Sequence, residues 1–263
     1  MIKKKVVSTR GHIHYWISDS KETTILFLHG LTADHRLFDQ QVDELSKDYQ
    51  LILVDLPLHG QSRRYNDFSF DHVSEDLKSI LDKENIEQVV IVGQSAGGYF
   101  SQSFVKSYPD YVKGFVGIGT TPFGSIYYKT SDLFWIRHFA FLASLYPYKT
   151  YCRLSAKSVG LNKQTQDSML ETLMDLGKKD MLNAVKSVYG AFLDEENEVE
   201  FNCPVLITYG QYDKTGYVSK YNDEWANAKG HALKLIPDAS HNANYDNPKY
   251  FNTILKEFIT TLA

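Results

Sequence analysis

The chain has 263 residues, a formal net charge of −4 and 43% hydrophobic residues, which is ordinary for a globular protein. It has no basic stripe, which argues against a nucleic-acid partner. The most apolar stretch, residues 133–148, is interrupted by Arg137 and His138 and is too short to span a bilayer. We therefore expect no stable membrane insertion and a cytoplasmic location.

Strand-like and helix-like segments alternate along most of the chain. Short apolar runs such as Val89-Val90-Ile91-Val92 are typical of strands buried on both faces of a parallel sheet. In chain order, we expect an antiparallel hairpin around residues 6–7 and 13–17, strands at 25–28 and 51–54, a helix at 73–81, a strand at 89–92, a helix at 96–108, strands at 115–118 and 205–209, a helix at 218–228, a strand at 233–236 and a helix at 250–262. This alternation predicts an α/β fold: a mostly parallel eight-stranded sheet with helices on both faces.

One region interrupts the alternation. Residues 122–198 contain no convincing buried strand; aromatic residues crowd the first part, and apolar residues recur at helical spacing from Leu170 to Val188. We therefore expect a helical cap, or lid, at residues 122–198, inserted in a core formed by residues 1–121 and 199–263. Because a lid must present apolar surface to the cleft below it, some of its aromatic residues are expected to line a substrate pocket.

The strongest chemical motif is Gly93-Gln94-Ser95-Ala96-Gly97, which follows a predicted buried strand and precedes a predicted helix. A serine on a sharp strand-to-helix turn is held in a strained backbone conformation, and small residues on both sides let neighbouring backbone pass close by. The turn also directs the hydroxyl toward the free N–H groups of the helix N-terminus. Ser95 is therefore the predicted catalytic nucleophile.

Two further residues complete a triad in the order Ser, Asp, His. Asp213 follows the strand at 205–209, and His241 follows the strand at 233–236. A serine nucleophile needs a general base, here His241, and a carboxylate that orients the base and stabilises its charged form, here Asp213. Asp238 and Asp55 are alternatives for the acid. Asp238 is more consistent with a turn, and Asp55 precedes the nucleophile, out of order for this pattern.

The predicted oxyanion hole uses backbone rather than side chains. Two convergent N–H donors must face the oxygen that becomes negative during acyl transfer. Ala96 follows the nucleophile directly, and Leu31 follows His29-Gly30 at the end of an earlier strand. We assign the two donors to the N–H groups of Leu31 and Ala96, and expect the His29 side chain to brace its loop.

Along nearly its whole length the sequence resembles the α/β-hydrolase superfamily. The matching segments are His29-Gly30, Asp55-Leu56-Pro57-Leu58-His59-Gly60-Gln61-Ser62, Gly93 to Gly97, Gly210-Gln211-Tyr212-Asp213 and Ser240-His241. The resemblance implies the serine-nucleophile branch with a helical cap between the sixth and seventh strands. A serine nucleophile argues against the branches that open halides or epoxides, which use aspartate. Leu58 departs from the family, where glycine is commoner in this turn.

These features predict a serine hydrolase, and a carboxylesterase that cleaves small or medium acyl or aryl esters is the most economical interpretation. The partner is then a small-molecule ester, and neither a metal nor an organic cofactor is required. The same triad could instead hydrolyse a carbon–carbon bond, lactone, amide or thioester. A different class of function is a ligand-sensing signalling protein that retains the triad. The sequence specifies neither the acyl chain length nor the oligomeric state.

Overall fold

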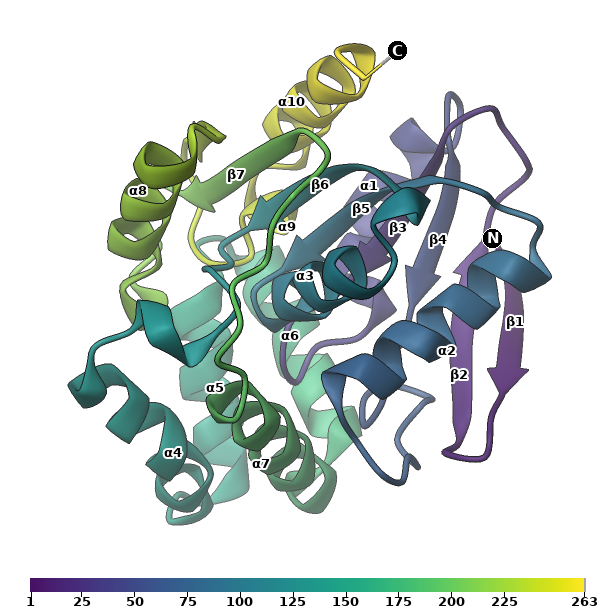
Figure 1. The fold of residues 1–263 in the computed structure, drawn as a ribbon. Helices are drawn as coiled ribbons and strands as arrows, with labels where there is room; N and C mark the ends of the chain where they lie inside the picture. Colours follow the sequence, from purple (N-terminus) through teal and green to yellow (C-terminus); the bar gives the residue numbers. More distant parts are fainter. Residues whose placement is uncertain (263) are drawn as a thin grey trace.

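One eight-stranded sheet organises the computed structural model, which describes residues 1–262 (Figure 1). The strands are β1 (Ile2–Val7), β2 (His12–Ile17), β3 (Thr24–Leu28), β4 (Gln50–Val54), β5 (Val89–Gln94), β6 (Val112–Ile118), β7 (Val205–Gly210) and β8 (Ala232–Ile236). Their spatial order is β1-β2-β4-β3-β5-β6-β7-β8. β2 pairs antiparallel with β1 and β4, whereas the six strands from β3 to β8 pair in parallel. The mostly parallel eight-stranded sheet and its antiparallel hairpin are thus confirmed.

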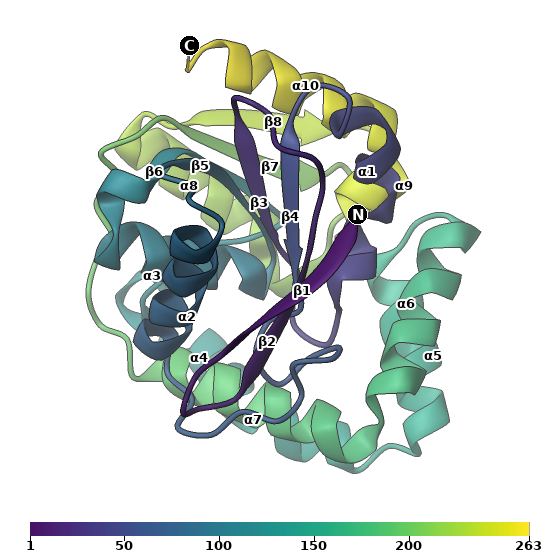
Figure 2. The same ribbon diagram turned by 90° about the vertical axis from the view of Figure 1, so that its right-hand side faces the viewer.

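Helices cover both faces of the sheet, as predicted. They are α1 (Asp39–Leu45), α2 (Phe70–Lys83), α3 (Ala96–Ser107), α4 (Thr130–Ser144), α5 (Tyr148–Val159), α6 (Lys163–Leu176), α7 (Lys178–Leu193), α8 (Val218–Lys229), α9 (Ala243–Asp246) and α10 (Pro248–Thr260). Figure 2 shows α2, α3 and α8 on one side of the sheet and α1 and α10 on the other. Within residues 1–262, no helix is both long enough and apolar enough to cross a membrane.

Burial on both faces explains why the central strands have continuous apolar runs. In β3, Leu26 and Leu28 belong to the cluster formed with α2, α3 and α8, whereas Ile25 and Phe27 belong to the cluster formed with α1 and α10. All four side chains are fully buried. Successive side chains of a strand point to opposite faces, so a strand covered on both sides needs apolar residues at every position.

The helix boundaries differ modestly from those expected. α2 begins three residues before the predicted helix at 73–81, because the Ser69 side chain accepts a hydrogen bond from the His72 N–H and caps the helix there. α8 ends at Lys229, and Gly230, which follows it with φ of 69°, caps the helix. α1 and α9 were not expected, because helices of seven and four residues are too short to show a clear apolar period.

Four helices, α4 to α7, lie between β6 and β7 in the chain and form a group beyond the ends of the central strands (Figure 1). α4 packs against α7, and α5 packs against α6. The two ends of this helical segment meet, since the Ser125 N–H and hydroxyl both donate to the Glu195 carbonyl oxygen, at 2.7 and 3.0 Å. The division into a core and a separate cap at residues 122–198 stays a prediction.

Two buried histidines join the loops that follow β3 and β4. The Leu56 N–H donates to His29 Nε2 at 3.0 Å, and His29 Nδ1 donates to the Gly30 carbonyl. The His29 side chain therefore braces its loop, as expected. His59 Nδ1 donates to the Pro57 carbonyl at 2.9 Å, and its ring lies edge-on to His29 with centroids 5.1 Å apart. Because His29 Nε2 accepts a hydrogen bond, the His29 ring must be neutral.

Burial, followed by the neighbouring His29, lowers the pKa of His59 to about 3. The pKa of a histidine in an unfolded chain is about 6.5. Between this pH and the lower pKa of folded His59, the unfolded chain therefore binds a proton that the folded chain does not. We expect the free energy of unfolding to fall as the pH drops below about 6.5, by up to about 1.4 kcal/mol per pH unit for this histidine.

Urea unfolding of the wild type and of His59→Asn at pH 7 and pH 5 tests this prediction. The asparagine variant should lose about 2 kcal/mol less stability over that interval than the wild type. His12→Asn, at an exposed position on β2, is the control and should follow the wild type. Equal pH dependence in the wild type and His59→Asn would contradict the prediction.

Candidate active site

Ser95 lies in the turn between β5 and α3 with a backbone conformation that side chains rarely adopt. Its φ is 52° and its ψ is −122°. The Ser95 N–H donates to the Ile118 carbonyl of β6 at 2.8 Å, and the Ser95 carbonyl accepts from the Gly98 N–H at 2.9 Å. These two bonds hold the strained residue between a strand and the first turn of a helix, which is the geometry that the pentapeptide predicted.

The flanking glycines are needed because backbone passes where a side chain would be. A Cβ at Gly97 would lie 2.0 Å from the Leu28 carbonyl oxygen of β3, and one at Gly93 would lie 2.6 Å from the Gly97 carbonyl oxygen. Neither position can hold a side chain unless the backbone moves. The small residues on both sides of Ser95 therefore let α3 begin directly against β3.

The structure brings Asp213 and His241 together from the loops that follow β7 and β8. His241 Nδ1 donates to Asp213 Oδ2 at 2.8 Å, and both side chains are buried. Burial alone would raise the pKa of the Asp213 carboxyl, but the charge and hydrogen bond of His241 and a 2.8 Å bond from the Thr215 N–H outweigh it. The net effect lowers the Asp213 pKa, so the carboxylate is ionised at neutral pH and orients the imidazole.

Two residues that support this pair were missed in the sequence. The amide Nε2 of Gln94 donates to the His241 carbonyl at 3.2 Å and fixes the histidine loop beside the nucleophile turn. Gly119, with φ of 54°, lies beneath the pair: a Cβ there would be 3.1 Å from His241 Nδ1 and 3.2 Å from Asp213 Oδ2. Gln94 lies inside the pentapeptide and could have been noticed, whereas nothing in the sequence around Gly119 marks it.

The two alternative acids have other roles. Asp55 is fully buried and accepts hydrogen bonds from the His35 N–H, from His35 Nδ1 at 2.7 Å and from the Gln61 N–H at 2.7 Å. Asp238 is exposed and has φ of 50° in the turn after β8. Neither forms a hydrogen bond to His241 within the described residues.

The predicted oxyanion donors lie at the first position of α3 and in the loop after β3. Ala96 is the first residue of α3, where N–H groups have no partner inside the helix. Ala96 lines the same cavity as Ser95 and His241. Leu31 is not among the residues lining that cavity. Within residues 1–262, the Leu31 N–H donates no hydrogen bond. The oxyanion role of these two N–H groups stays a prediction.

The cavity beside Ser95 has a volume of about 310 Å³. Its floor comes from the strand-end loops, and its walls come from α4, α7 and the segment that leads into α8. The side chains that line it come from α3, α4, α7, α8 and the loops between these elements, and many are aromatic: Tyr99, Thr121, Tyr128, Asp132, Trp135, Ile136, Phe139, Tyr189, Thr215, Tyr217, Val218 and Tyr221. This size suits a small or medium ligand, and most of the lining is apolar.

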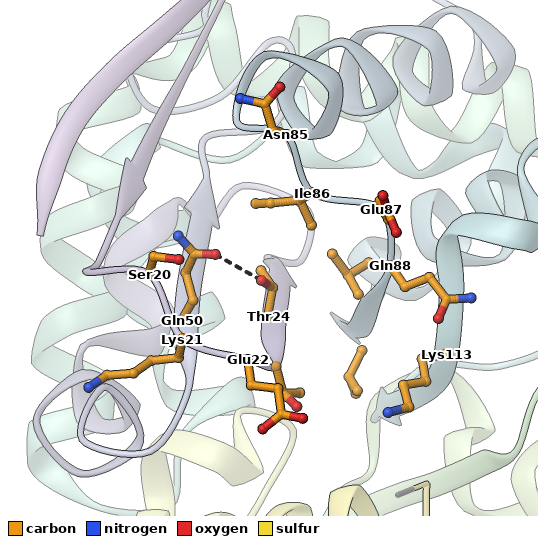
Figure 3. A pocket seen from close by; sticks show the side chains of 13 residues that line it. Ser20, Lys21, Glu22, Thr24, Gln50, Asn85, Ile86, Glu87, Gln88 and Lys113 are labelled. Carbon is orange, nitrogen blue, oxygen red and sulfur yellow. Dashed lines mark hydrogen bonds between the residues drawn. The ribbon is translucent and has the colours of Figure 1, made fainter.

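A second hollow, of about 350 Å³, lies at the opposite edge of the sheet (Figure 3). It is formed at the amino ends of β3, β4 and β5, where Thr24 donates to Gln50 at 2.9 Å, and charged side chains such as Lys21 and Lys113 surround it. The active-site groups all lie at the carboxyl ends of the strands. This hollow is therefore not part of the candidate active site.

One group of side chains in the described residues has ligand atoms close enough for a metal. The side-chain ligand atoms of Asp34, His35 and Asp55 lie within 4.8 Å of one another. Their bonding capacity is largely used inside the protein: the guanidinium of Arg36 contacts Asp34 at 2.8 Å, and His35 donates to Asp55. The group is best explained as a structural network that fixes the loop after β3.

Comparison with known proteins agrees with this architecture. A family model described as alpha/beta hydrolase fold matches residues 23–248. The AB hydrolase superfamily protein YisY of Bacillus subtilis is 24% identical, over 96% of this chain and 97% of its own length. A thermophilic esterase from Thermogutta terrifontis superposes with a TM-score of 0.82 at 17% identity, covering 100% of this chain and 99% of the esterase. The N-acyl homoserine lactonase AidH superposes with a TM-score of 0.80 at 20% identity, covering 100% and 98%.

At these identities the solved structures establish a shared fold and no more. The family model, however, spans most of the sheet, including the strand ends that hold Ser95, Asp213 and His241. The chain belongs to the α/β-hydrolase family.

Proposed function

We propose that this protein is a serine carboxylesterase that hydrolyses small or medium acyl or aryl esters. The observation that carries the proposal is the buried Asp213–His241 hydrogen bond of 2.8 Å beside the cavity that also contains the strained Ser95. A nucleophile, a base and a carboxylate that orients the base are the three groups that acyl transfer requires.

In this mechanism His241 removes the Ser95 proton as Ser95 Oγ attacks the ester carbonyl carbon. The N–H groups of Leu31 and Ala96 stabilise the oxyanion, and each donor in such a site lowers the barrier by about 3 kcal/mol. His241 then protonates the leaving alcohol. A water molecule that His241 deprotonates next attacks the acyl-enzyme, which releases the acid and restores Ser95.

The helices at residues 122–198 are proposed to act as a substrate-binding cap. Trp135, Ile136 and Phe139 of α4 and Tyr189 of α7 face the cavity and would contact the acyl or aryl group. The cytoplasmic location stays a prediction. Lactones are the second substrate class to test, since a lactone is an internal ester and the structurally similar AidH is described as an N-acyl homoserine lactonase.

A fluorophosphonate probe tests the nucleophile. We expect the wild type to be labelled and Ser95→Ala to be unlabelled, with turnover of p-nitrophenyl esters reduced at least about 10³-fold. Ser107→Ala, at an exposed position at the end of the same helix, is the matched control and should label like the wild type. Labelling of Ser95→Ala would refute the assignment. Failure of the wild type to turn over esters, lactones, amides and thioesters would instead favour a sensor.

The triad acid is tested by Asp213→Asn against Asp238→Asn. Asparagine in place of Asp213 cannot stabilise the charged imidazole and favours the wrong tautomer, so kcat should fall by about 10³- to 10⁴-fold. Asp238→Asn removes an exposed carboxylate and should change kcat by less than about threefold. Similar small losses in both variants would exclude Asp213 as the acid.

Gly119→Ala tests the packing beneath the catalytic pair. The added methyl group would crowd His241 and Asp213 and should lower kcat by about 10-fold or more, since small displacements of reacting groups are costly. Gly230→Ala is the matched control, because Gly230 also has a left-handed backbone, with open space around it. Both variants should lose about 1–2 kcal/mol of stability, but only Gly119→Ala should lose activity. Equal kcat values would contradict the prediction.

A further inference from the structure

Within residues 1–262, the cavity beside Ser95 is lined mostly by apolar and aromatic side chains, together with one carboxylate and no lysine or arginine. Asp132 is the one acidic residue among the described residues that line it. The walls around it are largely aromatic, so this carboxylate has no cation of the cavity wall to balance it.

Asp132 is held in place and kept available as an acceptor. It lies in the first turn of α4, where the helix N-terminus favours a negative charge. The Tyr221 hydroxyl donates to Asp132 Oδ2, and the Ser131 hydroxyl donates to Oδ1 at 3.2 Å. A carboxylate has about four acceptor sites, so two remain for a donor in the cavity. Burial and then the bond to Asp132 raise the pKa of Tyr221 to about 12, which keeps this hydroxyl a donor.

Aromatic rings flank the carboxylate. Trp135 follows Asp132 by three residues on α4, and both line the cavity, so they share one face of the helix. The ring of Tyr128 lies 4.7 Å from that of Tyr221, centroid to centroid. Faces of such rings attract cations, most strongly for tryptophan, and the attraction grows as the cation is removed from water.

The remaining hydroxyls near this corner are already satisfied. Tyr99 and Thr121 share a hydrogen bond of 2.9 Å, and the Tyr128 hydroxyl lies 2.5 Å from Thr121 Oγ1 and 2.6 Å from the Pro122 carbonyl. Each oxygen of this cluster therefore has a partner inside the protein. Among the described groups at this corner of the cavity, Asp132 is the one acidic acceptor, and it has sites left unfilled.

We propose that Asp132, with Trp135, Tyr128 and Tyr221, forms an ammonium-binding subsite of the substrate cavity. The substrate is accordingly an ester with a positively charged amine, and this amine is separated by several atoms from the ester bond that Ser95 cleaves. Lys220 Nζ lies 5.4 Å from the centroid of the Tyr221 ring, but no lysine or arginine of the described residues lines the cavity itself. A substrate with a carboxylate at the same position is disfavoured, because inside the cavity it would meet a like charge. The substrate class rests on the proposed esterase function, whereas ammonium binding can be measured without turnover.

A series of acetate esters of matched shape tests the subsite in the wild type. Acetylcholine carries a quaternary ammonium group, 3,3-dimethylbutyl acetate is its neutral isostere, and 3-acetoxypropanoate is anionic. We expect kcat/KM, followed by acid release in a pH-stat, to be at least about 10-fold higher for the cation than for the neutral ester, and lowest for the anion. A neutral ester that is hydrolysed as well as the cation would overturn the proposal.

Variants then locate the effect. Asp132→Asn should reduce kcat/KM for acetylcholine by about 10-fold and change the value for the neutral ester by less than about threefold. Asp180→Asn is the control, because Asp180 lies in the first turn of α7 but does not line the cavity. It should keep the preference of the wild type. A preference that survives in Asp132→Asn, or one that Asp180→Asn removes equally, would contradict the assignment.

Binding to Ser95→Ala separates this proposal from the esterase proposal. Tetramethylammonium titrated calorimetrically into Ser95→Ala should bind at least about 10-fold more tightly than to the double variant Ser95→Ala, Asp132→Asn. If ammonium binds but no ester is cleaved by the wild type, the esterase proposal fails and the subsite stands. If esters are cleaved but tetramethylammonium binds both proteins equally or neither, the subsite proposal fails alone.

Discussion

The candidate active site depends on how closely two backbone segments approach each other at the turn that holds Ser95. The Leu28 carbonyl oxygen of β3 occupies the space that a side chain at Gly97 would need. This contact lets α3 start beside β3, and the bond from the Ser95 N–H to the Ile118 carbonyl fixes the other side of the turn. The strained conformation at Ser95 persists because the sheet and the helix together leave the backbone no alternative.

Much of this arrangement follows from local patterns in the sequence. Strands buried on both faces produce the apolar runs from which the sheet was predicted, and β3 shows the alternation between two cores directly. Ser95, Asp213 and His241 follow such runs, so the parallel register alone brings them to one edge of the sheet. Local spacing was sufficient here because each residue lies within a few positions of a strand end.

Other parts of the site depend on contacts between distant segments and left no local pattern. Gly119 must be glycine because His241 and Asp213 lie against it, about a hundred residues later in the chain. In the sequence, Asp132 is an ordinary acidic residue in the first turn of a helix. Only the structure shows that the Tyr221 hydroxyl, 89 residues later in the chain, donates a hydrogen bond to it. The cap aromatics were expected to include pocket residues. Trp135 and Phe141 are both largely exposed, and only three-dimensional packing shows that Trp135 lines the cavity whereas Phe141 does not.

The hydrogen bonds between Ser125 and Glu195 close the helical segment on itself. The chain leaves this point and returns to it after four helices, so the length and sequence between these residues can change while the path of the sheet stays the same. A segment whose two ends are held together in this way can be replaced by another of different length or sequence. Ser95, Asp213 and His241 all lie outside residues 125–195, whereas Trp135, Phe139 and Tyr189 lie inside them. Changes within this segment therefore alter one wall of the cavity and leave the predicted catalytic residues in place.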